Sequence, residues 1–309
     1  MEKINFYEQI ERNKRYSWIL MVLVFATVAV LSVAFAIIIA GMYDIGTMFI
    51  FLIFATVFNI GYILATYYKS ADIAVSSVGA IPADAPQYKQ LNNIVEEMAI
   101  ASGQPKPKVY VMATKDINAF AAGRDPEHSI ICVTEGCLQK LERQELQSVV
   151  AHEMTHIRNF DIRFVTLVAV MVGLVSILSQ MFLRSMWYGG GGRNRGRGGG
   201  GGLFIVLVLA GLILSIIAPL IVKLVQLAIS RKREYMADAG AVELTRYPQG
   251  MIEALKKIGE DYASPGEHTK VNAAVAPMFL ADTSKTRFIG LLETHPPIKD
   301  RIKALEKML

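Results

Sequence analysis

The chain has 309 residues, of which 53% are hydrophobic and only 19% are charged, and its formal net charge is +5. Soluble domains average about 25% charged residues, so this composition argues against an ordinary soluble enzyme. The many aromatic residues exclude a disordered linker, and only two cysteines, Cys132 and Cys137, exclude a disulfide-rich scaffold. We interpret both as reduced, packed thiols. The modest, scattered positive charge fits anchoring beside a membrane better than a nucleic-acid surface, so no nucleic-acid partner is expected.

Four apolar stretches are each long enough to cross a bilayer, which takes about 20 residues. They run roughly over residues 17–40, 45–68, 164–183 and 203–222. The alternative, a core helix of a large soluble domain, is weaker for the first two, whose uncharged apolar runs exceed what a core helix needs, than for the last two. A cleavable signal peptide is disfavoured because the first apolar run exceeds the 7–15 residues of a signal sequence and a second span follows at once.

The distribution of basic residues predicts the orientation of these spans. Four basic residues precede the first span, and the turn 41–44 after it has none. By the positive-inside rule, the N-terminus and residues 69–163 lie in the cytoplasm. Arginines in the loop between the last two spans, which this topology places outside, run against that rule: Arg184, Arg193, Arg195 and Arg197. The glycine-rich part of that loop, Gly189–Gly202, is typical of a flexible linker; an RNA-binding tract is disfavoured because aromatic residues do not interleave the arginines.

The segment between the second and third spans is expected to form a compact α/β unit. Helical spacing predicts a helix over 86–103, with Gly103 as its cap. Alternation predicts strands over 108–112, 118–122 and 129–133, followed by a helix that starts near Thr134. A longer helix from about Arg143 is expected to continue without a break into the third apolar stretch.

One motif carries chemistry: His152–Glu153–Met154–Thr155–His156. On a helix, residues i and i+4 lie about 6 Å apart along the axis on one face, so both imidazoles can bind one metal ion. Glu153 points to where a carboxylate can hold a water and accept its proton. The alternative is a pair of surface histidines.

Catalytic zinc needs a third protein ligand, which must come from further along the chain. The metzincin pattern is excluded because Asn159 and Ile162 stand where it needs Gly and His or Asp. The best candidate is Glu234, with Asp238 one helical turn later as an acceptor for the free N–H of a ligand histidine. A solvated charged helix is the alternative for this segment. A hairpin formed by the last two spans returns Glu234 to the side of His156, at roughly 18 and 12 Å of helix from the spans.

The order of these features resembles the HtpX-like membrane zinc metalloproteases, which are relatives of the CAAX prenyl proteases. The matching residues are His152–His156 with Asp161, then Arg231 and Arg233–Glu234 with Ala237–Asp238, and finally Thr294–Pro297 with Arg301–Ile302. The resemblance implies a membrane-anchored α+β protein of the gluzincin type of zincin, mostly helical, with four transmembrane helices and a small sheet. It implies one Zn²⁺ per chain, held by His152, His156 and Glu234, and Glu153 as general base. It also implies that Asn118, Ala119, Phe120 and Ala121 form a substrate-lining edge strand. His295 is either an oxyanion helper or a structural histidine.

The chain is therefore expected to have four parts. Residues 1–68 form an N-terminal tail and a transmembrane hairpin, and residues 164–222 form a second transmembrane hairpin with the Gly/Arg-rich loop. Residues 69–163 and 223–309 form the first and second parts of a cytoplasmic catalytic domain. The resemblance implies a multi-pass protein of the cell (inner) membrane that cleaves cytoplasmic portions of misfolded or damaged membrane proteins, and unfolded polypeptides, in quality control and stress response. The lipid bilayer and other membrane proteases are the candidate partners. The alternatives are a prenyl-peptide protease, a membrane scaffold or transporter, and a holdase with an inactive site.

Overall fold

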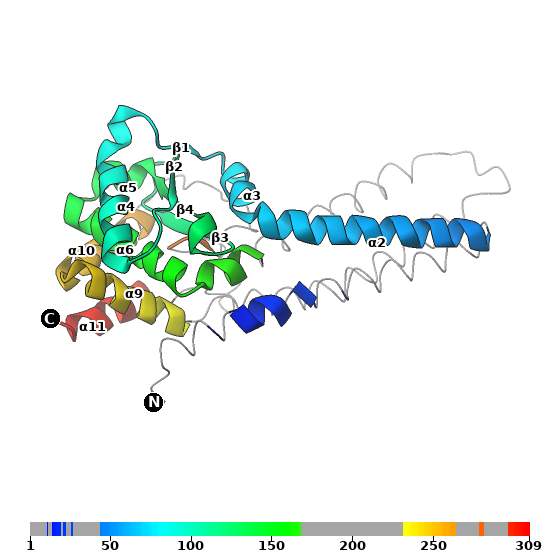
Figure 1. Cartoon of the computed structure of the whole chain (residues 1–309). Coiled ribbons are helices and arrows are strands. Elements are labelled where there is room, and N and C mark those ends of the chain that lie inside the picture. The colour runs from blue at the N-terminus through cyan, green and yellow to red at the C-terminus, as the bar shows by residue number, and fades with distance from the viewer. Residues whose placement is uncertain are drawn as a thin grey trace, which may run out of the picture.

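A computed structural model of the chain describes residues 44–167, 231–263, 278–280 and 296–309, together with a few residues between positions 11 and 26. The described part is mostly helical and contains one small mixed sheet (Figure 1). Helix α2 (Ile45–Tyr68) projects away from the other described elements, which gather around the sheet. The mostly helical α+β organisation expected from the sequence is therefore confirmed.

The sheet has four strands in the order β1–β2–β4–β3. They are β1 (Ile81–Pro82), β2 (Lys108–Met112), β3 (Ala119–Gly123) and β4 (Ser129–Thr134). β2 and β4 are parallel, and β1 and β3 run antiparallel to their neighbours, so β3 forms one edge of the sheet. The three predicted strands are confirmed to within one residue. β1 was not predicted, because a two-residue strand has no measurable alternation.

Alternate side chains of the strands pack on opposite faces of the sheet. One face packs in the main core against α4 (Lys89–Ser102), α6 (Arg143–Arg158), α9 (Arg231–Thr245) and α10 (Pro248–Ala263). The other face packs against α3 (Ser70–Ser77) and residues 278–279. The remaining elements are the turns η1 (Pro86–Tyr88) and η2 (Pro126–His128) and the helices α5 (Glu135–Lys140) and α11 (Ile298–Glu306). The predicted helix over 86–103 is present as η1 and α4, and Gly103 caps it with φ +65°.

Helix α6 is shorter than the sequence indicated. It begins with a capping box, in which the Glu142 and Glu145 side chains each accept from the other's backbone N–H, and it ends at Arg158. Phe160 has φ +58°, and helical residues resume only at Asp161. The expectation of an unbroken helix into the third apolar stretch was therefore wrong, as was the roughly 12 Å helical distance based on it. A left-handed residue that is not glycine gives no sequence signal for the break.

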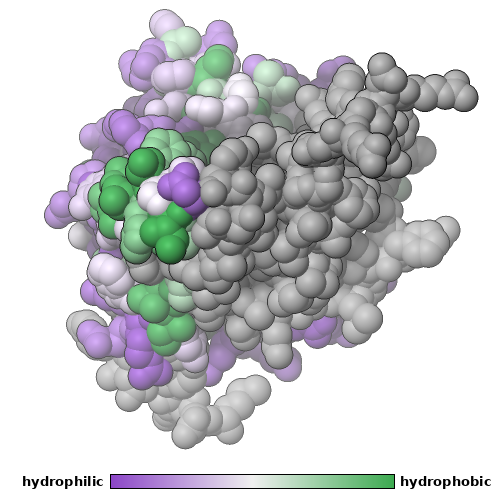
Figure 2. All heavy atoms as spheres, turned by 90° about the vertical axis from the view of Figure 1, so that its right-hand side faces the viewer, coloured by the Kyte–Doolittle hydropathy of each residue, from purple (hydrophilic) through white to green (hydrophobic). Residues whose placement is uncertain are grey.

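Among the described residues, one helix is long and apolar enough to cross a membrane, the 24-residue helix α2. Asp44 caps its start by accepting a hydrogen bond from the Thr47 backbone N–H. Most of its large apolar side chains are exposed, for example Ile50 at 71% and Phe54 at 69%. Figure 2, which faces the outer end of this helix, shows apolar side chains there in green. The other three predicted spans and the Gly/Arg-rich loop lie wholly or largely outside the described residues.

Candidate metal centre

Helix α6 places the two motif histidines one turn apart on the same face. Their Nε2 atoms lie 3.2 Å from each other, and their ring centroids are 4.8 Å apart. The helix is buried along most of its length, so His152 is 1% exposed and the site lies inside the fold rather than on its surface.

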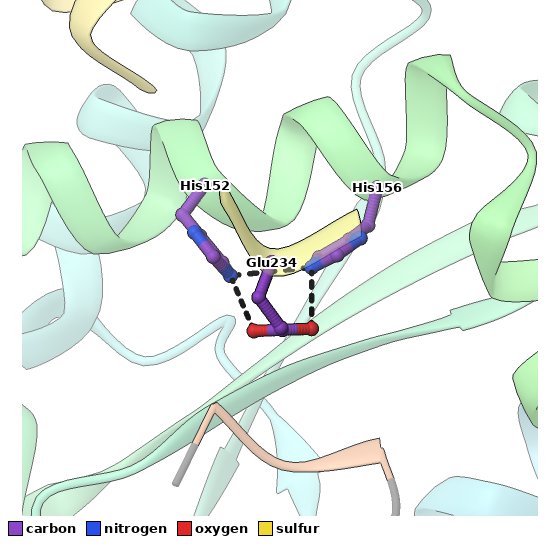
Figure 3. A group of neighbouring side chains, drawn as sticks. All are labelled: His152, His156 and Glu234. Atoms are coloured by element: carbon purple, nitrogen blue, oxygen red, sulfur yellow. Dashed lines mark hydrogen bonds and ion pairs between the residues drawn. The ribbon is translucent and has the colours of Figure 1, made fainter. Parts of the chain in front are cut away.

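Helix α9 packs against α6 and brings Glu234 to the histidines, although 78 residues separate Glu234 from His156. One carboxylate oxygen lies 3.7 Å from His152 Nε2 and the other 3.7 Å from His156 Nε2. Figure 3 shows the three side chains pointing at one another.

This donor set fits a zinc ion. The candidate ligand atoms all lie within 4.8 Å of one another. Ligands about 2.0–2.1 Å from a tetrahedral zinc are separated by about 3.3 Å, close to the observed 3.2 and 3.7 Å. Two imidazoles and one carboxylate are also the ligand set of many catalytic zinc sites.

The Nδ1 atom of each histidine faces an aspartate, which leaves Nε2 for a metal. His152 Nδ1 lies 3.0 Å from Asp238 Oδ1, so the structure places Asp238 where the sequence predicted. His156 Nδ1 lies 3.1 Å from Asp161 Oδ2. No role was predicted for Asp161, because residues five positions apart on a continuous helix do not share a face and the break at Phe160 was not expected.

The two histidines have opposite pKa shifts. Burial lowers the pKa of His152 to about 4, although Asp238 opposes this shift, so His152 is neutral at pH 7. Burial also acts to lower the pKa of His156, but the Asp161 hydrogen bond and the Glu234 charge outweigh it and raise that pKa to about 9. In the absence of metal, His156 is therefore the protonated member of the pair.

The three candidate ligands line a pocket, and Glu153 lies in that pocket with only 2% of its surface exposed. Burial raises the pKa of its carboxyl to about 7, and the Glu234 charge adds to the shift, while His156 and the Ala121 backbone N–H oppose it. A general base works best when its pKa is close to the working pH, so Glu153 is suited to proton transfer at neutral pH.

The predicted substrate-lining residues are only partly at this pocket. Ala121 lines it, together with Met278, Phe279 and Leu280. Asn118 is buried, and its side chain donates to the Tyr262 hydroxyl instead. The Ala119 carbonyl accepts from the Leu280 N–H, and the Phe120 ring packs against Phe279 on the opposite face of the sheet. His295 lies outside the described residues.

Comparison with known proteins identifies the family. A family model described as Peptidase family M48 matches residues 85–309. The chain belongs to peptidase family M48. A "Protease HtpX homolog" from Caldanaerobacter subterraneus subsp. tengcongensis is 48% identical over 258 residues, covering 83% of this chain and 84% of that protein. A protein of the same name from Dictyoglomus thermophilum is 38% identical over 308 residues, covering 100% and 96%.

The resemblance of this M48 chain to the HtpX-like proteases is therefore confirmed. Among solved structures, that of S. mikatae Ste24p aligns with a TM-score of 0.47 and 20% sequence identity. The alignment covers 83% of this chain and 58% of the Ste24p chain, so this chain spans less than two thirds of that protein.

Proposed function

We propose that the chain is a membrane-anchored zinc metalloendopeptidase that hydrolyses peptide bonds with a water molecule activated by Glu153. The observation that carries this proposal is the convergence of His152, His156 and Glu234 on one point, with Glu153 in the same pocket. Membership of peptidase family M48 supports it.

Each residue of the site has a separate role in the proposed hydrolysis. A bound zinc ion would polarise the scissile carbonyl and lower the pKa of the attacking water. His152 and His156 offer Nε2 to the ion, and Glu234 offers its carboxylate. Glu153 accepts the proton of the water and returns it to the leaving amine, and the Ala121 N–H orients its carboxylate during both steps.

The substrate would bind as an added strand beside β3. Such pairing uses main-chain hydrogen bonds and so tolerates many sequences, which suits a protease for unfolded polypeptides. Because Leu280 already bonds to the Ala119 carbonyl and the Ala121 N–H bonds to Glu153, substrate pairing would use the carbonyl of Ala121, the residue of β3 that lines the pocket. In this register the scissile bond would lie near Glu153, which lines the same pocket as Ala121.

The physiological role that we propose is cleavage of cytoplasmic portions of misfolded or damaged membrane proteins, as part of quality control during stress. The exposed apolar helix α2 supports attachment to the cell membrane. The basic residues before the first apolar stretch support a cytoplasmic catalytic domain. Likeness to proteins named HtpX homologs supports the protease activity, and other membrane proteases are the proposed partners.

Hydrolysis of casein by detergent-purified protein tests this function. The protein is purified with a chelator to limit self-cleavage and is then loaded with zinc. We expect zinc to restore cleavage in the wild type and not in Glu153→Gln, which keeps the shape of the side chain but cannot accept the proton. The exposed Glu243→Gln change on α9 is the matched control and should leave cleavage unchanged. Zinc-dependent cleavage by Glu153→Gln at the wild-type rate would exclude Glu153 as the base.

A further inference from the structure

Each candidate histidine ligand belongs to the same three-part arrangement, in which an aspartate lies behind the ring and an arginine pairs with the aspartate. The two sets are His152–Asp238–Arg301 and His156–Asp161–Arg233. We propose that Arg301 and Arg233 are positioning residues that lock the aspartates and so fix both histidine rings with Nε2 toward the metal. This proposal rests on the metal site of the proposed function.

Arg301 holds Asp238 with two hydrogen bonds. Its Nε donates to Oδ2 over 2.8 Å and its Nη2 to Oδ1 over 2.6 Å. The planar guanidinium matches the carboxylate in this geometry, so the Asp238 side chain cannot rotate without breaking both bonds. Because the Asp238 oxygen that faces His152 also receives the Nη2 bond, the arginine sets where that imidazole can sit.

Arg233 plays the corresponding part behind His156, in a looser form. Its Nε lies 3.4 Å from Asp161 Oδ1, while the other oxygen of Asp161 faces His156. Its guanidinium also lies over the ring of Phe164, 5.3 Å from the centroid. We therefore expect Arg233 to contribute less than Arg301 to the position of its histidine.

Arg301 further connects three separate parts of the chain at the metal centre. It lies on α11 and is 1% exposed. Besides Asp238 on α9, its Nη1 lies 3.6 Å from Glu234 Oε2 and donates to the Leu280 carbonyl over 3.3 Å. The last described helix thereby contributes to the site through one side chain, and the segment beside β3 is tied to the same group.

The charges of the site explain why arginines occupy these positions. Buried charges are tolerated when they are paired, and four carboxylates lie together here: Glu153, Glu234, Asp161 and Asp238. Two guanidinium groups and a divalent ion balance four negative charges. On charge alone, however, an arginine next to a metal site repels the ion, so its removal should tighten metal binding. If the arginine instead positions the histidine, its removal should weaken zinc binding. The direction of the change in zinc affinity therefore distinguishes a positioning role from a charge effect.

Zinc affinity of the full-length protein in detergent, measured by competition with a chelator, tests the proposal. The variants are Arg301→Met, which removes the charge, and Arg301→Lys, which keeps the charge but cannot hold both oxygens of Asp238. We expect both to bind zinc about tenfold more weakly than wild type, at the lower end of the effect of residues behind metal ligands. Arg233→Lys should show a smaller loss.

The melting temperature of the metal-free variants separates positioning from general stabilisation. If Arg301 only stabilised the fold, its replacement would lower this temperature and leave zinc affinity unchanged. Arg143→Met is the matched control, because Arg143 holds Glu97 with two bonds on the surface of α6, away from the site. It should not change zinc affinity.

Zinc binding by the wild-type protein separates failure of the positioning role from failure of the proposed function. Wild-type protein that does not bind zinc would contradict the proposed function itself. Wild-type zinc binding together with unchanged affinity in Arg301→Lys, or tighter binding in Arg301→Met, would overturn the positioning role. If Arg301→Met does not fold, Arg301→Lys alone decides the question.

Discussion

The candidate ligands His152 and His156 lie one helical turn apart, yet they enter metal binding in different charge states. His152 is neutral at pH 7, whereas a metal ion must displace a proton from His156. The difference comes from the surroundings of each ring. Burial dominates at His152, while Asp161 and Glu234 dominate at His156. Assembly of the site is therefore coupled to proton release.

This coupling predicts how zinc affinity depends on pH. Below the His156 pKa of about 9, each fall of one pH unit should weaken zinc binding about tenfold, because the proton competes with the ion. Titrations against a chelator at pH 6.5, 7.5 and 8.5 would measure this, after correction for protonation of the chelator. Affinity that is constant over this range would show that His156 is already neutral.

The raised pKa of Glu153 predicts a pH-dependent gain in stability for Glu153→Gln in metal-free protein. A carboxyl with a pKa of about 7 in the folded state, against 4.5 as its ordinary value, stabilises the fold fully below pH 4.5 and loses that effect as pH rises through 7. Glutamine resembles the protonated carboxyl and does not titrate. At pH 8 the variant should be more stable than wild type by on the order of 3 kcal/mol, seen as a rise of about 8 °C in melting temperature, and at pH 5 the difference should be below about 1 kcal/mol. The same difference at both pH values would contradict the shift.

At the scale of elements, the site depends on how closely α6 and α9 approach. Gly240 of α9 lies against Thr155 of α6, and a Cβ atom at Gly240 would be 2.5 Å from the Thr155 side chain. Thr155 is buried, and its hydroxyl donates to the Ala151 carbonyl, so it has little freedom to move. This close approach brings Glu234 within reach of the histidines.

Gly240→Ala should therefore push α9 away from α6. We expect a loss of about 1–3 kcal/mol in the free energy of unfolding, typical of an overpacked core, together with weaker zinc binding. Thr155→Ala removes the atoms that clash, so the double variant should recover both properties in part. Wild-type behaviour of Gly240→Ala, or no recovery in the double variant, would show that this contact does not set the helix spacing.

Local patterns predicted the elements well because helices and strands follow the periodicity of apolar residues. The strand over 108–112 was placed to the residue, and the motif spacing placed both histidines on one face of α6. The break at Phe160 escaped prediction because its positive φ is fixed by the surrounding fold rather than by glycine or proline. The pairing of Arg301 with Asp238 was not predicted either, because a contact between residues 63 positions apart leaves no periodic pattern in the sequence.

For the whole molecule, the orientation of α2 decides on which side of the membrane the site works. A helix of 24 residues is about 36 Å long, enough to cross a hydrocarbon core of about 30 Å. Its start at Ile45 should then face outward and its end at Tyr68 should face the cytoplasm, the side on which we propose that the catalytic domain lies.

Labelling of engineered cysteines in intact cells would test this orientation. The two native cysteines give little background, because Cys132 is 1% exposed and Cys137 is fully buried, and burial raises the pKa of both thiols. A membrane-impermeant maleimide should label Ile45→Cys in intact cells and Lys69→Cys only after lysis, since both positions are well exposed. The reverse pattern would place the site outside the cytoplasm.

The most direct measurement is the zinc content of the purified protein beside its Glu234→Ala variant. We expect one zinc per wild-type chain and one in Glu153→Gln, because that change leaves the ligands in place. Glu234→Ala should lose most of its zinc, whereas Glu243→Ala, an exposed change on the same helix, should keep it. A full complement of zinc in Glu234→Ala would show that α6 and α9 do not build the metal site together.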